Sequence, residues 1–193
     1  MKYFKYLIRY IASFFYDIYY FFFGDILSRV QGFNYYKASK KYSDYLKQGN
    51  MMHIIAPIAE LYCKGRGLDI GAGKWVFRNA RAIENNDKEN AYLLNEKDED
   101  IDFIFSSHLV EHLENWEKAL KEWKRVLKKD GIIFLYLPHH SCKMWEPKIN
   151  DQHLWVPTYA KLEKHFTQQL NMTVLEGNKS VDGHLSFHMV IKK

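Results

Sequence analysis

Cysteine is scarce in this sequence, and the scarcity excludes one class of protein. Cys63 and Cys142 are the two cysteines among 193 residues, and they form neither a C-x-x-C pair nor an evenly spaced framework. Disulfide frameworks are typical of small secreted domains. The two residues are therefore predicted to be reduced thiols of a cytoplasmic protein, and we assign no chemistry to them.

A long uninterrupted apolar run is also missing. Residues 1–31 are rich in aromatic side chains, but Lys5, Arg9 and Asp17 interrupt them, and a membrane span needs about 20 predominantly apolar residues. No small-residue cleavage site precedes the Tyr-Phe run, which argues against a signal peptide. The apolar residues recur at helical spacing and predict an aromatic amphipathic helix: Phe4, Leu7, Ile8, Ile11, Phe14, Phe15, Ile18, Phe21 and Phe22.

Two roles are open for this N-terminal helix. It suits the inner surface of a membrane, since Phe and Ile would reach the acyl chains while Lys and Arg meet anionic headgroups. It equally suits packing on its own domain or against a second copy in a homodimer, because both cases need a large apolar face. A polar connector, residues 40–50, follows it. We therefore expect a helical segment and linker over residues 1–50 and the main domain over residues 51–193.

The main domain lacks a net charge. Residues 1–50 hold eight basic and three acidic residues, which leaves 20 of each sign in residues 51–193. Nucleic-acid enzymes present a basic surface, so we expect no nucleic-acid partner. A main domain of about 140 residues also leaves little room for a separate substrate domain. A small molecule, or the exposed end of a glycan, is the favoured substrate.

Strands and helices alternate along the main domain. A helix is predicted over residues 51–64, and a second over 114–131, where Gly131 is placed to end it. A third helix is predicted near residues 157–170. Predicted strands cover residues 68–70, 101–105, 132–138, 172–177 and 185–193. This order predicts an α/β fold with a doubly wound, mostly parallel sheet, in which ligands bind at the carboxyl ends of the strands.

The first of these strands runs into a glycine turn, Asp69-Ile70-Gly71-Ala72-Gly73. Two glycines allow a close approach of the backbone to a ligand, and the amides that follow can bind an anionic group. A nicotinamide-type fingerprint would place glycine at position 76, where this chain has Val76. The turn alone is a weak indication of function, and its value comes from the residues around it.

Together, "GLDIGAG", "RAIE" and "IDFIFSSHLVEHLENWEKALKEWKRVLKKDGIIFLYLPHH" resemble the small class I, type 11-like S-adenosylmethionine-dependent methyltransferases of bacterial genomes. The resemblance covers about residues 64–170. It implies a Rossmann-like methyltransferase fold, S-adenosylmethionine as cofactor, and methyl transfer to a hydroxyl or an amine. Base methylation is not expected, since the "[DN]-P-P-[YF]" turn of those enzymes is Phe105-Ser106-Ser107-His108 here.

The resemblance assigns cofactor roles to residues in four segments. Asp69, Gly71, Ala72 and Gly73 would form the turn beneath the methionine part, with Asp69 toward the ammonium group. Glu84 would bind the ribose hydroxyls, and Asn90 with Ala91 would hold the adenine amine. Ser106, Ser107 and His108 would lie under the sulfonium.

Two departures from the family pattern affect the cofactor region. The third glycine of the family is replaced by Trp75, and only 31 residues separate Ile70 from Ile101. A parallel crossover needs a dozen or more residues, so we expect the fold to be shortened between the first and fourth strands. A non-catalytic, methyltransferase-like scaffold subunit is the alternative that these departures leave open.

Histidines supply the predicted acceptor side. His139 directly follows the strand 132–138, His153 lies in the next loop, and a histidine can act as a base near neutral pH. His139, His108 and His153 are the candidate catalytic residues, and Trp145 and Trp155 are candidate stacking walls for a sugar. An N-terminal helix on a membrane would favour a surface-polysaccharide or lipid-linked acceptor.

One motif favours a different chemistry. His108, Glu111 and His112 spell H-x-x-E-H, the inverted zinc-protease signature, which would suit a zinc hydrolase. Such a site needs a third ligand, and the sequence offers no second motif to supply it. We therefore assign no metal, and we expect His108 to face the cofactor while Glu111 and His112 begin the helix that follows.

Overall fold

The computed structural model describes residues 52–182 and 184–193. The predicted amphipathic helix lies outside these residues. The elements in chain order are α3 (Met52–Tyr62), β1 (Gly67–Ile70), β2 (Ala80–Ile83), β3 (Ile101–Ser107), η1 (Val110–His112), α4 (Trp116–Val126), β4 (Leu127–Pro138), η2 (Lys143–Trp145), α5 (Tyr159–Lys164), η3 (His165–Gln169), β5 (Thr173–Gly177) and β6 (Ser186–Lys192). Within the described residues, no helix is long and apolar enough to cross a membrane.

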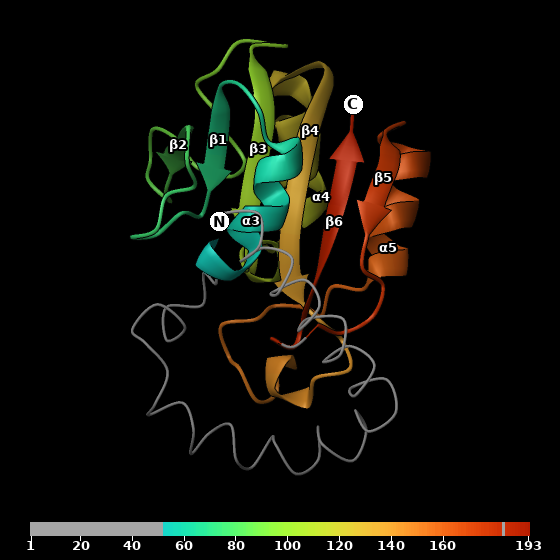
Figure 1. The fold of residues 1–193 in the computed structure, drawn as a ribbon. Helices are drawn as coiled ribbons and strands as arrows, with labels where there is room; N and C mark the ends of the chain where they lie inside the picture. Colours follow the sequence, from blue (N-terminus) through green and yellow to red (C-terminus); the bar gives the residue numbers. More distant parts are fainter. Residues whose placement is uncertain (1–51, 183) are drawn as a thin grey trace, which may run out of the picture.

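Six strands form one sheet in the order β2-β1-β3-β4-β6-β5. The strands β2, β1, β3 and β4 are mutually parallel, and β6 is antiparallel to both of its neighbours. Helices cover both faces of the sheet, with α3 on one side and α4 on the other (Figure 1). The predicted doubly wound, mostly parallel α/β fold is confirmed. The expected shortening of the fold is confirmed as well. Within the described residues, β2 is the one strand that lies in sequence between β1 and β3.

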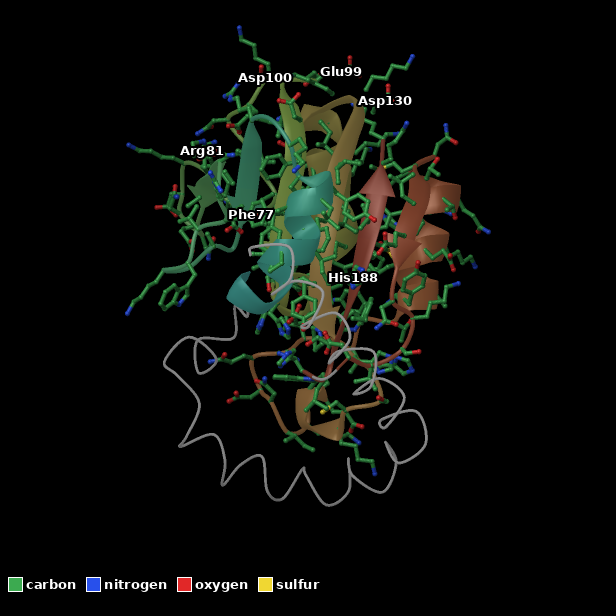
Figure 2. The ribbon with its side chains drawn as sticks, viewed as in Figure 1. Phe77, Arg81, Glu99, Asp100, Asp130 and His188 are labelled. Carbon is green, nitrogen blue, oxygen red and sulfur yellow. The ribbon has the colours of Figure 1, made fainter. Side chains whose placement is uncertain are left out.

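Two apolar cores fill the two faces. The larger core joins the sheet to α4, α5 and η3, and Trp123 of α4 and Phe166 of η3 are fully buried in it. The smaller core lies under α3 and is built around Phe77, whose ring stacks on that of Phe105 at 4.4 Å (Figure 2). Strands that are apolar on both faces are typical of a parallel sheet covered on both sides.

The helix α4 ends earlier than the sequence predicts. It stops at Val126, because Leu127 turns to an extended conformation and pairs with Ile101 of β3. The prediction that Gly131 ends this helix is therefore wrong, and Gly131 lies within β4. Asp130, also within β4, has a φ of 64° and lies in the irregular stretch between the pairs Ile101–Leu127 and Phe103–Ile132. Pairing of Leu127 with the sheet outweighed the helix propensity of the two lysines that follow it.

Charged residues mark the end of the sheet away from the candidate site. Glu99, Asp100 and Asp130 gather where β3 begins and where the chain enters β4 (Figure 2). The carboxyl ends of β1 to β4 lie at the opposite end of the sheet, beside the loop that follows β4 (Figure 1). The glycine turn, His108 and His139 follow these carboxyl ends, so the ligand site is expected at this end of the sheet.

Candidate functional site

The glycine turn leaves β1 in a conformation that favours glycine. Gly71 has a φ of 79° and Gly73 a φ of 57°, which costs an L-residue about 1–2 kcal/mol. A Cβ at Gly71 would lie 3.0 Å from the Leu109 side chain, whereas one at Gly73 would meet nothing within 4 Å. The turn is therefore packed beneath Gly71 and open above Gly73, as a ligand cradle requires.

Glu84 lies against the open side of this turn. It follows β2 directly, and its Oε1 accepts a hydrogen bond of 2.6 Å from the Gly73 amide. The Glu84 side chain is exposed, so its second oxygen can accept from a ligand's hydroxyl groups. The structure thus brings together Glu84 and Gly73, two residues that the sequence assigned to one cofactor.

Asp69, near the end of β1, is hydrogen-bonded to the segment that follows the glycine turn. Its Oδ2 accepts a 2.7 Å hydrogen bond from the Phe77 amide, while Oδ1 is buried with no hydrogen-bond partner among the described residues. The pKa of Asp69 is raised to about 7, mainly by burial and to a smaller extent by the nearby Glu84 carboxylate, while the hydrogen bond from the Phe77 amide works to lower it. The expected contact of Asp69 with the ammonium group stays a prediction, with Oδ1 as the available acceptor.

The residue in the family's third glycine position does not close the turn. Trp75 is 39% exposed, and the aromatic ring beneath the turn is that of Phe77 instead. The sequence analysis did not single out Phe77, which lies four residues after Gly73 and carries no motif of its own. Its amide and its ring both tie the loop to the sheet, to Asp69 and to Phe105 respectively.

The predicted adenine segment forms a compact local turn. The Asn90 side chain accepts from the Tyr92 amide and donates to the Asn86 carbonyl. Ala91 is buried, and its carbonyl accepts a 2.9 Å hydrogen bond from the Trp123 indole of α4. These bonds fix the segment on α4, while the contact of Asn90 and Ala91 with adenine stays a prediction.

The two serines at the end of β3 are buried. Ser106 is fully buried, and its hydroxyl donates a 2.9 Å hydrogen bond to the Ile70 carbonyl, which ties β3 to the last residue of β1. Ser107 is 2% exposed. Ser106 therefore supports the glycine turn from inside the sheet, and the expected contacts of both serines with the sulfonium stay predictions.

The other candidate residues have defined partners. His139 Nδ1 lies 2.8 Å from the Ser141 hydroxyl, and Nε2 lies 3.2 Å from the Lys179 carbonyl. Burial lowers the pKa of His139. Trp155 stacks on Trp116 at 4.8 Å. A role of His139 as base stays a prediction, and it would require one of these two hydrogen bonds to open.

The H-x-x-E-H segment does not begin α4. Val110, Glu111 and His112 form the short η1 turn, Leu113 is extended, and α4 starts only at Trp116. His108 has a left-handed φ of 51° and lies outside the turn. The expectation that Glu111 and His112 begin the helix is therefore wrong, because the chain turns tightly at the end of β3 before it can enter a helix.

A cluster of three histidines surrounds Glu111 instead, and we call His108, Glu111, His112 and His153 the histidine cluster. Glu111 Oε1 lies 3.5 Å from His108 Nδ1, 3.9 Å from His112 Nε2 and 4.0 Å from His153 Nε2. Glu111 is fully buried, and neither of its carboxylate oxygens has a hydrogen-bond partner within the described structure. His153 is thus the third side chain that the motif alone could not supply.

The pKa shifts of Glu111 and His153 have different causes. Burial works to raise the pKa of Glu111, but the His108 and His112 rings outweigh it, and the pKa is lowered. Burial lowers the pKa of His153, although Glu111 opposes this effect. The two shifts have the same sign but different causes, since the neighbouring rings dominate at Glu111 and burial dominates at His153.

Comparison with known proteins gives the same fold. Residues 51–135 match the family model described as "Methyltransferase domain". The uncharacterized protein MJ1123 of the archaeon Methanocaldococcus jannaschii is 32% identical over 106 residues, which are 44% of this chain and 52% of that protein. The chain thus spans about half the length of that curated relative.

Solved structures agree over a larger part of the chain. A S-adenosylmethionine-dependent methyltransferase from Aquifex aeolicus has a TM-score of 0.58 at 16% identity, covering 81% of this chain and 96% of that one. Another, from Archaeoglobus fulgidus, has a TM-score of 0.56 at 14% identity and covers 83% of this chain and 99% of that one. The fold is that of the S-adenosylmethionine-dependent methyltransferases.

The methyltransferase fold accounts for the position of the glycine turn. In this fold the turn after β1 and the acidic residue after β2 lie side by side, as Gly73 and Glu84 do here. The matched domain and the solved structures imply S-adenosylmethionine as the cofactor. The residues fit such a group, since Glu84 is exposed and the space above Gly73 is open. The bacterial origin that the sequence suggested stays a prediction, because the curated relative is archaeal.

Proposed function

We propose that the chain is a S-adenosylmethionine-dependent methyltransferase that acts on a small molecule or a glycan. The observation that carries this proposal is the exposed Glu84 carboxylate held on the Gly73 amide at the open glycine turn. A carboxylate in this position can accept both hydroxyls of a ribose. The neutral charge of residues 51–193 argues against a nucleic-acid acceptor, which would call for a basic surface.

The cofactor supplies an electrophilic methyl group on a sulfonium, so the protein mainly has to position the acceptor in line with it. The glycine turn and Glu84 would orient the cofactor, and Asp69 Oδ1 would accept from its ammonium group. The histidines beyond β3 and β4 would face the acceptor. Of these, His139, His108 and His153 are the candidates to take a proton from an acceptor hydroxyl.

Calorimetry tests the cofactor part of this proposal. We expect the full-length protein to bind S-adenosylhomocysteine, and Glu84→Ala to weaken binding at least about 10-fold, since two hydrogen bonds of about 1 kcal/mol each are lost. Asp87→Ala is the matched control, because Asp87 is also exposed and follows β2. Wild-type protein that binds neither S-adenosylmethionine nor S-adenosylhomocysteine would instead support the non-catalytic scaffold.

A screen with labelled cofactor addresses the acceptor. Sugar nucleotides and glycolipids are the first classes to test, because a surface-polysaccharide precursor suits both the small domain and the aromatic N-terminal segment. Liposome flotation of the chain with and without residues 1–30 tests the membrane part separately. Equal flotation of the two forms would exclude a peripheral membrane role for that segment and leave a homodimer contact to be tested by sedimentation.

A further inference from the structure

The Glu111 carboxylate is buried without any of the hydrogen bonds that such a group ordinarily has. The described part of the chain provides no hydrogen bond to either oxygen, and the residue has no solvent exposure. An ionised carboxylate in this state costs several kcal/mol unless a cation or a donor lies next to it. The groups that do lie next to it are the three imidazole rings, so the protonation of their nitrogens decides how the charge is balanced.

Backbone carbonyls fix two of these rings. His112 Nδ1 lies 2.8 Å from the Gln152 carbonyl, and His153 Nδ1 lies 2.8 Å from the Trp145 carbonyl. A carbonyl oxygen only accepts, so both Nδ1 atoms must carry the proton and donate it. In a neutral ring, Nε2 is then left with a lone pair. It is Nε2 of both rings that faces Glu111 Oε1.

Ser186 orients the His108 ring, so that this ring also turns a nitrogen toward Glu111. The Ser186 hydroxyl donates to the His184 carbonyl at 3.1 Å, so its oxygen accepts from His108 Nε2 at 3.0 Å. His108 Nδ1, the nitrogen nearest Glu111, is then the one with the lone pair. With all three rings neutral, three lone pairs and a carboxylate converge on one point, so the site needs a positive charge, which either protons on the rings or a bound cation can supply.

We propose that the histidine cluster is a binding site for one divalent first-row transition-metal ion, with Glu111, His112 and His153 as ligands and His108 as a fourth donor within reach. Ligating histidines in proteins almost always donate their second ring nitrogen to a carbonyl or carboxylate, which fixes the ring toward the metal. His112 and His153 both do so. The proposal does not require the methyltransferase activity proposed above, but it assigns His108 and His153 to the metal and leaves His139 as the candidate base.

The distances are compatible with coordination after a small contraction. Zinc bonds of about 2.0–2.2 Å place tetrahedral donors roughly 3.3–3.5 Å apart. In the structure the donor atoms of Glu111, His112 and His153 lie within 4.8 Å of one another. Two imidazoles and one carboxylate favour Zn²⁺ and its first-row neighbours over Mg²⁺, which prefers oxygen ligands and retains water.

The metal would join two segments far apart in sequence. Glu111 and His112 lie in η1 after β3, whereas His153 lies in the loop after β4. These segments already share a hydrogen bond of 2.9 Å from the Leu154 amide to the Glu111 carbonyl. The His112 side chain is 30% exposed, while those of His108 and His153 are 4% and 3% exposed. An ion would therefore enter, and keep a water ligand, on the His112 side.

Equilibrium dialysis of tag-free, chelator-treated full-length protein tests the site. We expect one Zn²⁺ or Co²⁺ ion per chain, no binding of Mg²⁺ at equal concentration, and a rise in melting temperature on adding Zn²⁺. Co²⁺ would also report its nitrogen ligands through visible absorption. Wild-type protein that stays empty with Zn²⁺ and Co²⁺ would overturn the proposal.

Variants separate coordination from folding. Glu111→Gln and His153→Gln each remove a ligand but keep a polar side chain, and each should lower Zn²⁺ affinity at least about 100-fold. His140→Gln is the matched control, because His140 is an exposed histidine outside the cluster. Its affinity should equal that of the wild type. If Glu111→Gln, shown by circular dichroism to be folded, binds Zn²⁺ as tightly as the wild type, the ion lies elsewhere and the assignment fails.

Discussion

Two buried carboxylates, Asp69 and Glu111, lie at the same end of the sheet and have opposite electrostatics. Asp69, at the glycine turn, accepts the Phe77 amide and faces another carboxylate, and its pKa is raised to about 7. Glu111, in the histidine cluster, has no hydrogen-bond donor within the described residues and faces three imidazoles, and its pKa is lowered. Burial works to raise the pKa of both groups; it prevails at Asp69, whereas the neighbouring imidazole rings outweigh it at Glu111.

The difference indicates what each region can bind. A carboxyl group that gains a proton near pH 7 can respond to a cationic ligand without a permanent cation beside it. A carboxylate held ionised by neighbouring imidazole rings needs a lasting positive charge, which comes from protons on those rings or from a bound cation. The glycine turn therefore suits exchange of a cofactor bearing an ammonium group, whereas the histidine cluster suits a resident ion.

The largest expected effect is the pH dependence of stability that Asp69 confers. Its pKa of about 7 lies above the ordinary value of 3.8, so the native state holds a proton that the unfolded chain releases between these values. The free energy of unfolding should therefore fall as pH rises from about 4 to 7, by up to roughly 4 kcal/mol. Urea denaturation of wild type and Asp69→Asn from pH 4.5 to 8.5 measures this dependence.

The amide of Asp69→Asn can still accept from Phe77 but has no charge to desolvate. The difference in unfolding free energy between variant and wild type should therefore grow in the variant's favour as pH rises, and level off above about pH 7. Glu84→Gln is the control: it removes the nearby charge that also raises the pKa of Asp69, so it should reduce the slope without abolishing it. A difference that is constant across the pH range would disprove this account of Asp69.

The second effect concerns Glu111 in metal-free protein. At pH 8, Glu111→Gln should destabilise the fold by about 1–3 kcal/mol, since the lowered pKa of Glu111 means that the folded state favours the ionised carboxylate over a neutral side chain. Thermal and urea unfolding in the presence of a chelator would measure the loss. Glu96→Gln should act in the same direction, because Glu96 is also buried and is paired with Arg81.

Much of the fold and of the glycine turn could be predicted from the sequence. The alternation of strands and helices along the chain, the glycine turn and the candidate role of Glu84 could be predicted, because each depends on local periodicity or on a short motif at a strand end. The core face of α4 was predictable for the same reason, with Trp116, Leu120 and Trp123 at helical spacing. The C-terminal end of α4 was not, since pairing of Leu127 with Ile101 is a tertiary contact.

The histidine cluster could be predicted only in part. Two of its histidines and Glu111 were conspicuous as a motif, but His153 lies 41 residues beyond His112, and nothing local indicates that the loop after β4 returns to η1. The carbonyls that orient the rings carry no signal in the sequence at all, because every residue has one. The motif therefore identified the chemistry, and only the fold could supply the completing ligand and the ring orientations.

The third effect distinguishes packing beneath the glycine turn from the open space above it. Gly71→Ala should destabilise the fold by about 2 kcal/mol, since it combines a left-handed conformation with crowding against Leu109. Gly73→Ala meets no neighbour within 4 Å and should cost about 1 kcal/mol. Its methyl group would nevertheless occupy the open space of the proposed cofactor site. Calorimetry should show weaker binding of S-adenosylhomocysteine by Gly73→Ala, and unchanged affinity would place the cofactor elsewhere.

The smallest effect tests whether Ser106 supports the fold or touches the cofactor. Its hydroxyl donates to the Ile70 carbonyl inside the sheet, so Ser106→Ala should lower the free energy of unfolding by about 1 kcal/mol through that lost hydrogen bond. Affinity for S-adenosylhomocysteine should stay within about twofold of the wild type, because the buried hydroxyl is already used. A large loss of affinity with unchanged stability would mean that the hydroxyl turns toward the cofactor, and Ser106 would then join Glu84 as a binding residue.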